Sequence, residues 1–354
     1  MTPAAFAIPG DIGLPTGGYT YDRRVLALLA QFGVAARHVE LPGSFPDPSA
    51  ADLAETARRL SAIAADAVLL IDGLAYGAMP ARLIEGLRQP IIALVHHPLC
   101  LEAGLTQARQ QQLRELETAA LALARRVIVT SGATARTLQA DFAVVEDKIT
   151  VAEPGTDRAP RAQGSQGGTL RLLAVGAVVP RKAYDLLVHA LASLHDHDWH
   201  LTIAGPTDRG PAALAALHAA VRDTQLEDRV TIAGPMSQEQ LGALYAAADA
   251  FLMPSLYEGY GMVLGEAMAR GLAIVCTTGG AAAETAPEGA AIKVPPGDVA
   301  ALSEAVRRVL ADGALRRRLS DASWLAGQKL PRWEDTAARI AGVIEELAGK
   351  ERMA

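Results

Sequence analysis

The sequence predicts an α/β protein of two domains, each built from βα units on a parallel sheet. Short apolar runs alternate with stretches of helical period, which is typical of repeated βα units. The 354 residues are too many for one ordinary domain of roughly 150 residues, and they fit two. We therefore expect two similar α/β halves in tandem.

The expected strands are short runs rich in Val, Ile, Leu and Ala, six in each half. In the first half they are Ala4 to Ile8, Val34 to Leu41, Ala67 to Ile71, Ile91 to His96, Val127 to Thr130 and Ile149 to Ala152. In the second half they are Leu170 to Val175, His200 to Ala204, Val230 to Ala233, Ala250 to Met253, Ala273 to Cys276 and Ile292 to Val294. The segments between them carry apolar residues at helical spacing.

A linker is expected where the periodic pattern stops. Pro154 to Asp157 and the Gly, Gln and Ser-rich stretch from Arg158 to Thr169 have neither helical nor strand period. The predicted domains are residues 1–160 and 161–332. A last helix, 333–354, is expected to cross back to the first domain. Such sheets bind ligands at their carboxyl ends, so a cleft between the domains is expected to hold the site.

Composition excludes several classes of protein. The chain has 33 Lys and Arg against 39 Asp and Glu, a net charge of −6, and no run of five basic residues, which argues against nucleic acid. No apolar run approaches the ~20 residues of a membrane span, although peripheral membrane contact stays open. The amino-terminal residues lack the pattern of a signal peptide, and two isolated cysteines offer no disulfide framework. The predicted compartment is the cytoplasm.

The most informative segment runs from Pro254 to Gly271. An apolar strand passes into a glycine-bearing turn and then into a helix, whose first backbone N–H groups favour phosphate or hydroxyl oxygens. Glu258 on the turn and Glu266 on the helix are carboxylates, which accept hydrogen bonds from sugar hydroxyls. This segment resembles the E-x7-E motif of retaining glycosyltransferases of the GT-B fold, specifically glycosyltransferase family 4 (glycosyl transferases group 1). The similarity continues through Ala273 to Val275, Gly279 and Gly280, Glu284 and Val294 to Asp298, and it covers most of residues 170 to 312.

The resemblance implies two Rossmann-like domains facing a central cleft, with residues 1–160 binding the acceptor and residues 161–332 binding the nucleotide sugar. It also assigns roles within this segment. Glu258 is expected to contact the donor sugar, together with the backbone of the turn, and Glu266 the ribose hydroxyls. The base is expected near the end of a strand in the second half. The donor-binding residues implied are Gly234, Pro235, Gly259, Tyr260, Gly261, Met262, Val263 and Glu266.

Arg181 and Lys182 follow the first strand of the second half. A diphosphate leaving group needs positive charge, and Lys182 matches the phosphate-binding lysine of the family. The alternative is a solvated basic pair at the start of a helix, where the helix dipole disfavours cations. The family also has an arginine at the position of Ala177, so either Arg181 substitutes for that charge or turnover is weaker.

Two features of the first half are similar to features of the same family, a glycine-rich loop and a histidine. Gly17 and Gly18 lie in a loop like the glycine-rich loop that faces the donor phosphates, although a tight turn would use the same residues. His97 matches the cleft histidine of the family. Its neighbour His96 points to the other side of the strand and is expected to be a packed or capping residue.

The predicted function is transfer of a sugar from a UDP- or GDP-sugar to an acceptor, with retention at the anomeric carbon. The predicted catalytic residues are His97, Arg181, Lys182 and Glu258, and no metal or cofactor is expected beyond the nucleotide sugar as co-substrate. Two alternatives stay open: a sugar-nucleotide epimerase, for which Asp11 or Asp72 would supply acid or base, and a catalytically weak nucleotide-sugar-binding protein. The sequence does not identify the acceptor, the sugar, the nucleotide base, the linkage or the oligomeric state.

Overall fold

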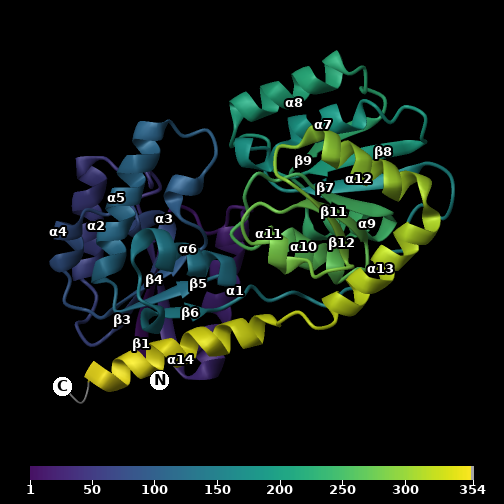
Figure 1. The fold of residues 1–354 in the computed structure, drawn as a ribbon. Coiled ribbons are helices and arrows are strands. Elements are labelled where there is room, and N and C mark those ends of the chain that lie inside the picture. Colours follow the sequence, from purple (N-terminus) through teal and green to yellow (C-terminus); the bar gives the residue numbers. More distant parts are fainter. Residues whose placement is uncertain (352–354) are drawn as a thin grey trace. The chain divides into compact units, whose positions relative to one another are not determined.

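The computed structural model describes residues 1–351, with side chains through residue 349, and the chain divides into two compact units (Figure 1). Unit 1 holds Met1–Gly155 and the described part of the segment that begins at Pro331, and unit 2 holds Thr156–Leu330. The first boundary therefore lies at Gly155 and not at residue 160. A side chain at Gly155 would clash with the backbone of Trp333, so the returning segment packs directly on this glycine.

Unit 1 is a six-stranded parallel sheet in the order β2-β1-β3-β4-β5-β6. Its strands are β1 (Thr2–Pro9), β2 (Val34–Leu41), β3 (Val68–Asp72), β4 (Ile91–Val95), β5 (Arg126–Val129) and β6 (Ile149–Val151). Its helices are α1 (Gly17–Leu28), α2 (Ala50–Ser61), α3 (Gly73–Tyr76), α4 (Ala81–Glu85), α5 (Gln107–Leu123) and α6 (Gly132–Phe142), with 3₁₀ turns η1 (Leu29–Phe32), η2 (Leu99–Leu101) and η3 (Glu146–Lys148). All five residues of β3 and of β4 are buried, as expected when helices cover both faces of a parallel sheet.

Unit 2 repeats this architecture with the strand order β12-β11-β10-β7-β8-β9. Its strands are β7 (Leu170–Val175), β8 (Trp199–Ala204), β9 (Val230–Gly234), β10 (Ala250–Met253), β11 (Ala273–Thr277) and β12 (Ala291–Val294). Its helices are α7 (Tyr184–Leu191), α8 (Pro211–Asp223), α9 (Gln238–Ala247), α10 (Met262–Met268), α11 (Ala282–Thr285), α12 (Val299–Ala311) and α13 (Gly313–Gly327), with the 3₁₀ turn η4 (Pro180–Lys182). Leu172 and Ala174 belong to one core cluster and Leu173 and Val175 to another, because alternate residues of a strand face opposite sides.

The last helix, α14 (Trp333–Glu351), belongs to unit 1. Its buried residues Trp333, Ala337, Ile340 and Ile344 recur at helical spacing and form one apolar face. The ring of Trp333 meets the edge of Tyr21 on α1 at 5.9 Å between centroids. Neither α14 nor any other helix within the described residues is long and apolar enough to span a membrane.

Every strand expected from the sequence is present, and the chain reverses its direction of sheet growth once in each unit. In unit 1 the reversal separates β1 from β3, and in unit 2 it separates β7 from β10. Loops leave such a pair of strands in opposite directions, which opens a crevice at their carboxyl ends where α/β proteins bind ligands. Ligand sites are therefore expected at the loops after β1 and β3 and at those after β7 and β10.

Candidate active site

The loops after β7 and β10 are joined to each other by hydrogen bonds. Their strands are direct neighbours, with Ala250 opposite Leu172 and Phe251 opposite Leu173. Beyond the strands, the N–H of Leu256 donates to the carbonyl of Arg181 at 2.8 Å, and the Arg181 guanidinium donates to the carbonyl of Tyr257 at 2.8 Å. These bonds bring the Arg181 and Lys182 turn against the Glu258 turn, although 76 residues separate Lys182 from Glu258.

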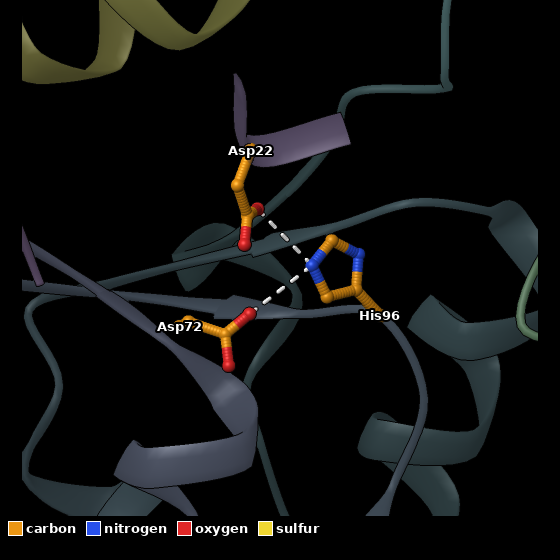
Figure 2. Close-up of side chains that lie close together, drawn as sticks. All are labelled: Asp22, Asp72 and His96. Atoms are coloured by element: carbon orange, nitrogen blue, oxygen red, sulfur yellow. Dashed lines mark hydrogen bonds and ion pairs between the residues drawn. The ribbon is translucent and has the colours of Figure 1, made fainter. Parts of the chain in front are cut away.

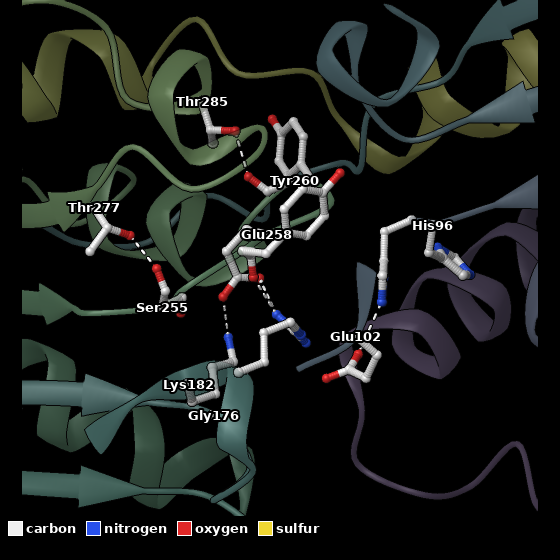
Figure 3. Close-up of polar contacts among 12 residues, drawn as sticks. His96, Glu102, Gly176, Lys182, Ser255, Glu258, Tyr260, Thr277 and Thr285 are labelled. Atoms are coloured by element: carbon white, nitrogen blue, oxygen red, sulfur yellow. Dashed lines mark hydrogen bonds and ion pairs between the residues drawn. The ribbon is translucent and has the colours of Figure 1, made fainter. Parts of the chain in front are cut away.

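Arg181, Lys182 and Glu258 form a buried group of ionised side chains. Figure 3 shows Lys182 against Glu258. The Lys182 ammonium lies 2.6 Å from Oε1 of Glu258, and the Arg181 guanidinium lies 3.1 Å from Oε2. The three side chains are 11%, 16% and 8% exposed in the order Lys182, Arg181, Glu258. Burial by itself raises the pKa of Glu258, but the two cations outweigh it and lower that pKa to about 2. Two cations and one carboxylate leave the group with a net charge of +1.

Glu258 is held by a turn that follows β11. Its N–H donates to the carbonyl of Gly279 at 3.1 Å, and its own carbonyl accepts from Ala281 at 2.8 Å. A side chain at Gly279 would clash with the Leu256 carbonyl, and one at Gly280, where φ is +62°, would clash with the Glu258 carbonyl. Glycine is therefore required at both positions to fix the Glu258 backbone.

Lys182 is positioned by the end of β7. A Cβ atom at Gly176, where φ is +146°, would lie 3.0 Å from Cε of Lys182 and 2.9 Å from the hydroxyl of Tyr184. Gly205, at the end of β8, packs in turn on the carbonyl of Gly176, and its N–H donates to the carbonyl of Gly234 at 2.9 Å. Three glycines thus bring the ends of β7, β8 and β9 together. Gly234 itself faces open space, since a Cβ there would meet nothing within 4 Å.

Glu266 lies on α10, which begins after Gly261 in the left-handed conformation, with φ of 87°. The hydroxyl of Tyr245 donates to Oε2 of Glu266 at 2.8 Å, and the guanidinium of Arg270 lies 4.5 Å from the Tyr245 ring. Burial raises the pKa of Glu266, while the Tyr245 hydrogen bond opposes that shift. Tyr245 thus occupies one oxygen of the Glu266 carboxylate. Tyr245 was not predicted from the sequence, because nothing in the helical pattern of α9 marks one residue as a partner of α10.

In unit 1, the glycine loop packs against His96. Thr16 caps α1 by accepting from Tyr19, which places Gly17 and Gly18 in the first turn. A Cβ atom at Gly18 would lie 3.4 Å from Cδ2 of His96. His97, the histidine expected in the site, has its Nε2 3.1 Å from a carboxylate oxygen of Glu102. The role expected for His97 stays a prediction.

His96 joins two buried carboxylates, an arrangement that the sequence analysis did not foresee (Figure 2). Its Nε2 lies 3.2 Å from Oδ1 of Asp22 on α1 and 3.2 Å from Oδ2 of Asp72 at the end of β3. Among the described residues, these three alone offer three His, Cys, Asp or Glu ligand atoms close enough for one metal ion, all within 4.8 Å of one another. The distances equal those of ordinary hydrogen bonds, so protons account for the cluster and we do not assign it as a metal site.

Two protein families match the chain in tandem. Residues 19–159 match Glycosyltransferase Family 4, and residues 156–323 match Glycosyl transferases group 1. The chain is 29% identical over 283 residues to an MMP alpha-(1->4)-mannosyltransferase of Mycolicibacterium hassiacum, an alignment that covers 74% of this chain and 66% of that relative. The alignment thus spans just under two thirds of the relative's length.

Solved structures of similar fold cover nearly the whole chain. Sucrose-phosphate synthase from Thermosynechococcus elongatus superposes with a TM-score of 0.83 at 23% identity, over 98% of this chain and all of that one. The Anabaena protein HepE in complex with UDP gives 0.74 at 17% identity, over 97% and 100% of the two chains. This chain has the GT-B fold.

Proposed function

We propose that the protein transfers a sugar from a nucleotide diphosphate sugar, a UDP- or GDP-sugar, to an acceptor hydroxyl with retention at the anomeric carbon. The observation that carries this proposal is the buried group of Arg181, Lys182 and Glu258 at the reversal point of the unit 2 sheet. A group with net positive charge in a water-poor site suits a ligand that is itself an anion. The complex of the similar HepE structure with UDP supports a nucleotide as part of that ligand.

Charge stabilisation is the main chemical task in this reaction. As the bond between the sugar and the phosphate breaks, negative charge grows on the diphosphate, and preorganised cations stabilise it without reorganising. Lys182 and Arg181 supply these cations, since a diphosphate oxygen can take a position beside them. Glu258 is ionised at neutral pH, because its pKa is about 2, and so it accepts a hydrogen bond from a hydroxyl of the sugar.

Retention requires the acceptor to attack from the face that the diphosphate leaves. In the mechanism that we propose, the departing phosphate oxygen takes the acceptor proton, so no protein nucleophile is needed and positioning accounts for the rest. We also propose that transfer is independent of metal, because Arg181 and Lys182 supply the positive charge. Loss of transfer in EDTA, with recovery on adding Mg²⁺ or Mn²⁺, would contradict this assignment.

The test begins with a panel of nucleotide sugars in a thermal-shift assay, followed by acceptor profiling with the donors that bind. We expect a stabilising UDP- or GDP-sugar, and a product whose anomeric configuration, read by NMR, equals that of the donor. Glu258→Gln is the matched control, because it keeps the size of the side chain and removes its charge. An altered donor without transfer would indicate an epimerase, and binding without any turnover would indicate a binding protein.

A further inference from the structure

Ser255 is a buried serine on the turn that carries Glu258. It follows Pro254 after the end of β10 and precedes Glu258 by three residues. Ser255 is 0% exposed, and the hydroxyl of Thr277, at the end of β11, donates to its carbonyl (Figure 3). Because β10 and β11 are paired strands, this bond fixes the Ser255 backbone between their ends. The Ser255 hydroxyl can therefore change partners only by rotation about its own bonds.

The Ser255 hydroxyl is available as a donor. Its Oγ is buried and, among the described residues, has no hydrogen-bond partner of ordinary geometry. A buried hydroxyl without a partner is unfavourable, so it is expected to donate to an acceptor within reach. The Glu258 carboxylate is within reach: burial raises the pKa of Glu258, the charges of Lys182 and Arg181 lower it, and a hydrogen bond from Ser255 lowers it further by a smaller amount. With both cations in place, the Ser255 contribution is thus a minor one.

The hydroxyl gains importance when an anion competes for the two cations. Lys182 and Arg181 balance the charge of Glu258, and the proposed function gives the same two cations the diphosphate to neutralise. A diphosphate oxygen beside them weakens their hold on Glu258, whose side chain is 8% exposed and therefore poorly solvated. Glu258 then depends on donors that the diphosphate does not engage. Ser255 is such a donor, because its hydroxyl is neutral and buried on the same turn as Glu258.

We propose that Ser255 is a positioning residue that donates a hydrogen bond to Glu258 when a diphosphate engages the two neighbouring cations, and so keeps the carboxylate charged and oriented toward the donor sugar. A neutral side chain thus preserves the charge of Glu258 while both cations serve the leaving group. The proposal rests on the proposed function for the diphosphate and for the contact of Glu258 with the sugar.

The titration of Glu258 reports on this hydrogen bond. The charged groups that face Glu258 are Lys182, 2.6 Å from Oε1, and Arg181, 3.1 Å from Oε2. The phenol of Tyr184 on α7 also lies near; burial and then the charge of Glu258 raise its pKa, so it stays neutral. Removing one of these cations should therefore make the pKa of Glu258 sensitive to the Ser255 hydroxyl.

The first experiment measures the pKa of Glu258 by NMR in full-length protein with carboxyl-labelled glutamate, and Glu258→Gln identifies the signal. Lys182→Met removes one cation, so no ligand is needed. With both cations present, Ser255→Ala should leave Glu258 ionised down to about pH 3. In the Lys182→Met background, Ser255→Ala should raise the pKa of Glu258 by about one pH unit or more, as for loss of a hydrogen bond to a charged group. An equal pKa in Lys182→Met with and without Ser255→Ala would overturn the proposal.

Ser323→Ala is the matched control. Ser323 lies on α13, is 0% exposed, and its hydroxyl likewise has no partner within the described part of the chain. A general effect of losing a buried hydroxyl should appear in both variants, whereas the pKa of Glu258 should respond to Ser255→Ala alone. Ser255→Cys, of similar size but a weak donor, should behave like Ser255→Ala without leaving a cavity. A similar change of the Glu258 pKa in Ser323→Ala would reduce the effect to packing and overturn the proposal.

The second experiment adds pyrophosphate to the unaltered protein and to Ser255→Ala. Pyrophosphate should raise the pKa of Glu258 in both, and by about one pH unit more in the variant. An equal rise in the two proteins would overturn the role of Ser255. A Glu258 signal that does not respond to pyrophosphate would overturn the diphosphate site at Lys182 and Arg181, and with it the proposed function, whereas the Lys182→Met comparison tests the Ser255 bond independently.

The steady-state kinetics of sugar transfer separate positioning from a merely structural role. Ser255→Ala should lower kcat about tenfold with the KM for the donor nearly unchanged, because the hydrogen bond matters most as charge grows on the diphosphate. A raised KM with an unchanged kcat would contradict this role. The NMR measurements need no acceptor, so they can succeed even where sugar transfer is never observed.

Discussion

Replacing Lys182 by methionine tests the charge balance of the unit 2 site. The substitution keeps most of the side-chain volume and removes the ammonium that lies 2.6 Å from Glu258. Glu258 would then face Arg181 alone, in surroundings where it is 8% exposed. We expect a less stable protein at neutral pH, a higher pKa for Glu258, and transfer slowed by about 10²- to 10³-fold, as for loss of a preorganised donor to a developing anion.

The size of the stability loss follows from the pKa of Glu258. Lowering that pKa from 4.5 to about 2 corresponds to about 3 kcal/mol of folding free energy at neutral pH. For an acid whose pKa is lowered by folding, this contribution is fully present above pH 4.5 and is lost as the pH falls through 2. Of the two cations, Lys182 lowers the pKa of Glu258 more, so Lys182→Met should reduce the free energy of unfolding by about 2 kcal/mol or more. Breaking a buried ion pair by removing one partner typically costs about 3–5 kcal/mol, which is of similar size.

The assay is urea denaturation of both proteins between pH 7 and pH 2.5. The difference in free energy of unfolding should be largest at pH 7 and should shrink below pH 4.5, as protonation removes the charge that Lys182 balances. The double variant Lys182→Met with Glu258→Gln should recover much of the stability and none of the transfer activity. A difference that is the same at every pH, or a double variant no more stable than Lys182→Met, would refute the reasoning.

Three further substitutions test neighbouring parts of the site. Glu266→Ala should weaken donor binding by about 10- to 150-fold, the loss of hydrogen bonds to a charged group, and Tyr245→Phe by less than tenfold, because it removes only the group that orients Glu266. An unchanged dissociation constant in calorimetry would place Glu266 outside the site. Gly176→Ala should reduce turnover nearly as much as Lys182→Met, since its methyl group would displace the lysine; normal kinetics would mean that the lysine can move without effect. Ala177→Arg should raise turnover or tighten donor binding, because it adds a cation directly after Gly176 at a half-buried position, and a lower kcat with a folded protein would contradict that expectation.

The strands could be predicted because a parallel sheet covered on both faces needs continuous apolar runs. β2, β7 and β10 begin and end at the predicted residues, and the other strands differ by one or two residues at their ends. The contact between Lys182 and Glu258 could be predicted for a related reason. Each follows a strand of the same sheet, and the reversal of strand order makes those strands neighbours.

The cluster around His96 could not be predicted in the same way. Asp22 lies inside a helix, 50 residues before Asp72 and 74 before His96, and no sequence period relates the three. A buried aspartate on the inner face of a helix carries no local signal, since its partner is supplied by a different strand. The same reasoning applies to Tyr245, which contacts Glu266 across 21 residues. Side-chain pairs of this kind depend on how helices pack on the sheet, and local pattern does not encode that packing.

The absence of an arginine at position 177 changes how the site can assemble its positive charge. The resemblance to the family implies a cation there, directly after Gly176, and this chain has Ala177 instead. Arg181 lies four residues further along, and its guanidinium bonds both the Tyr257 carbonyl and Glu258, so it is fixed before any ligand arrives. A cation already paired with a carboxylate offers less attraction to a diphosphate than an unpaired one, since the ligand must compete with Glu258 for it. Restoring an arginine at 177 would add a charge that no carboxylate on this loop neutralises, which is why the gain should appear first in donor affinity and only then in turnover.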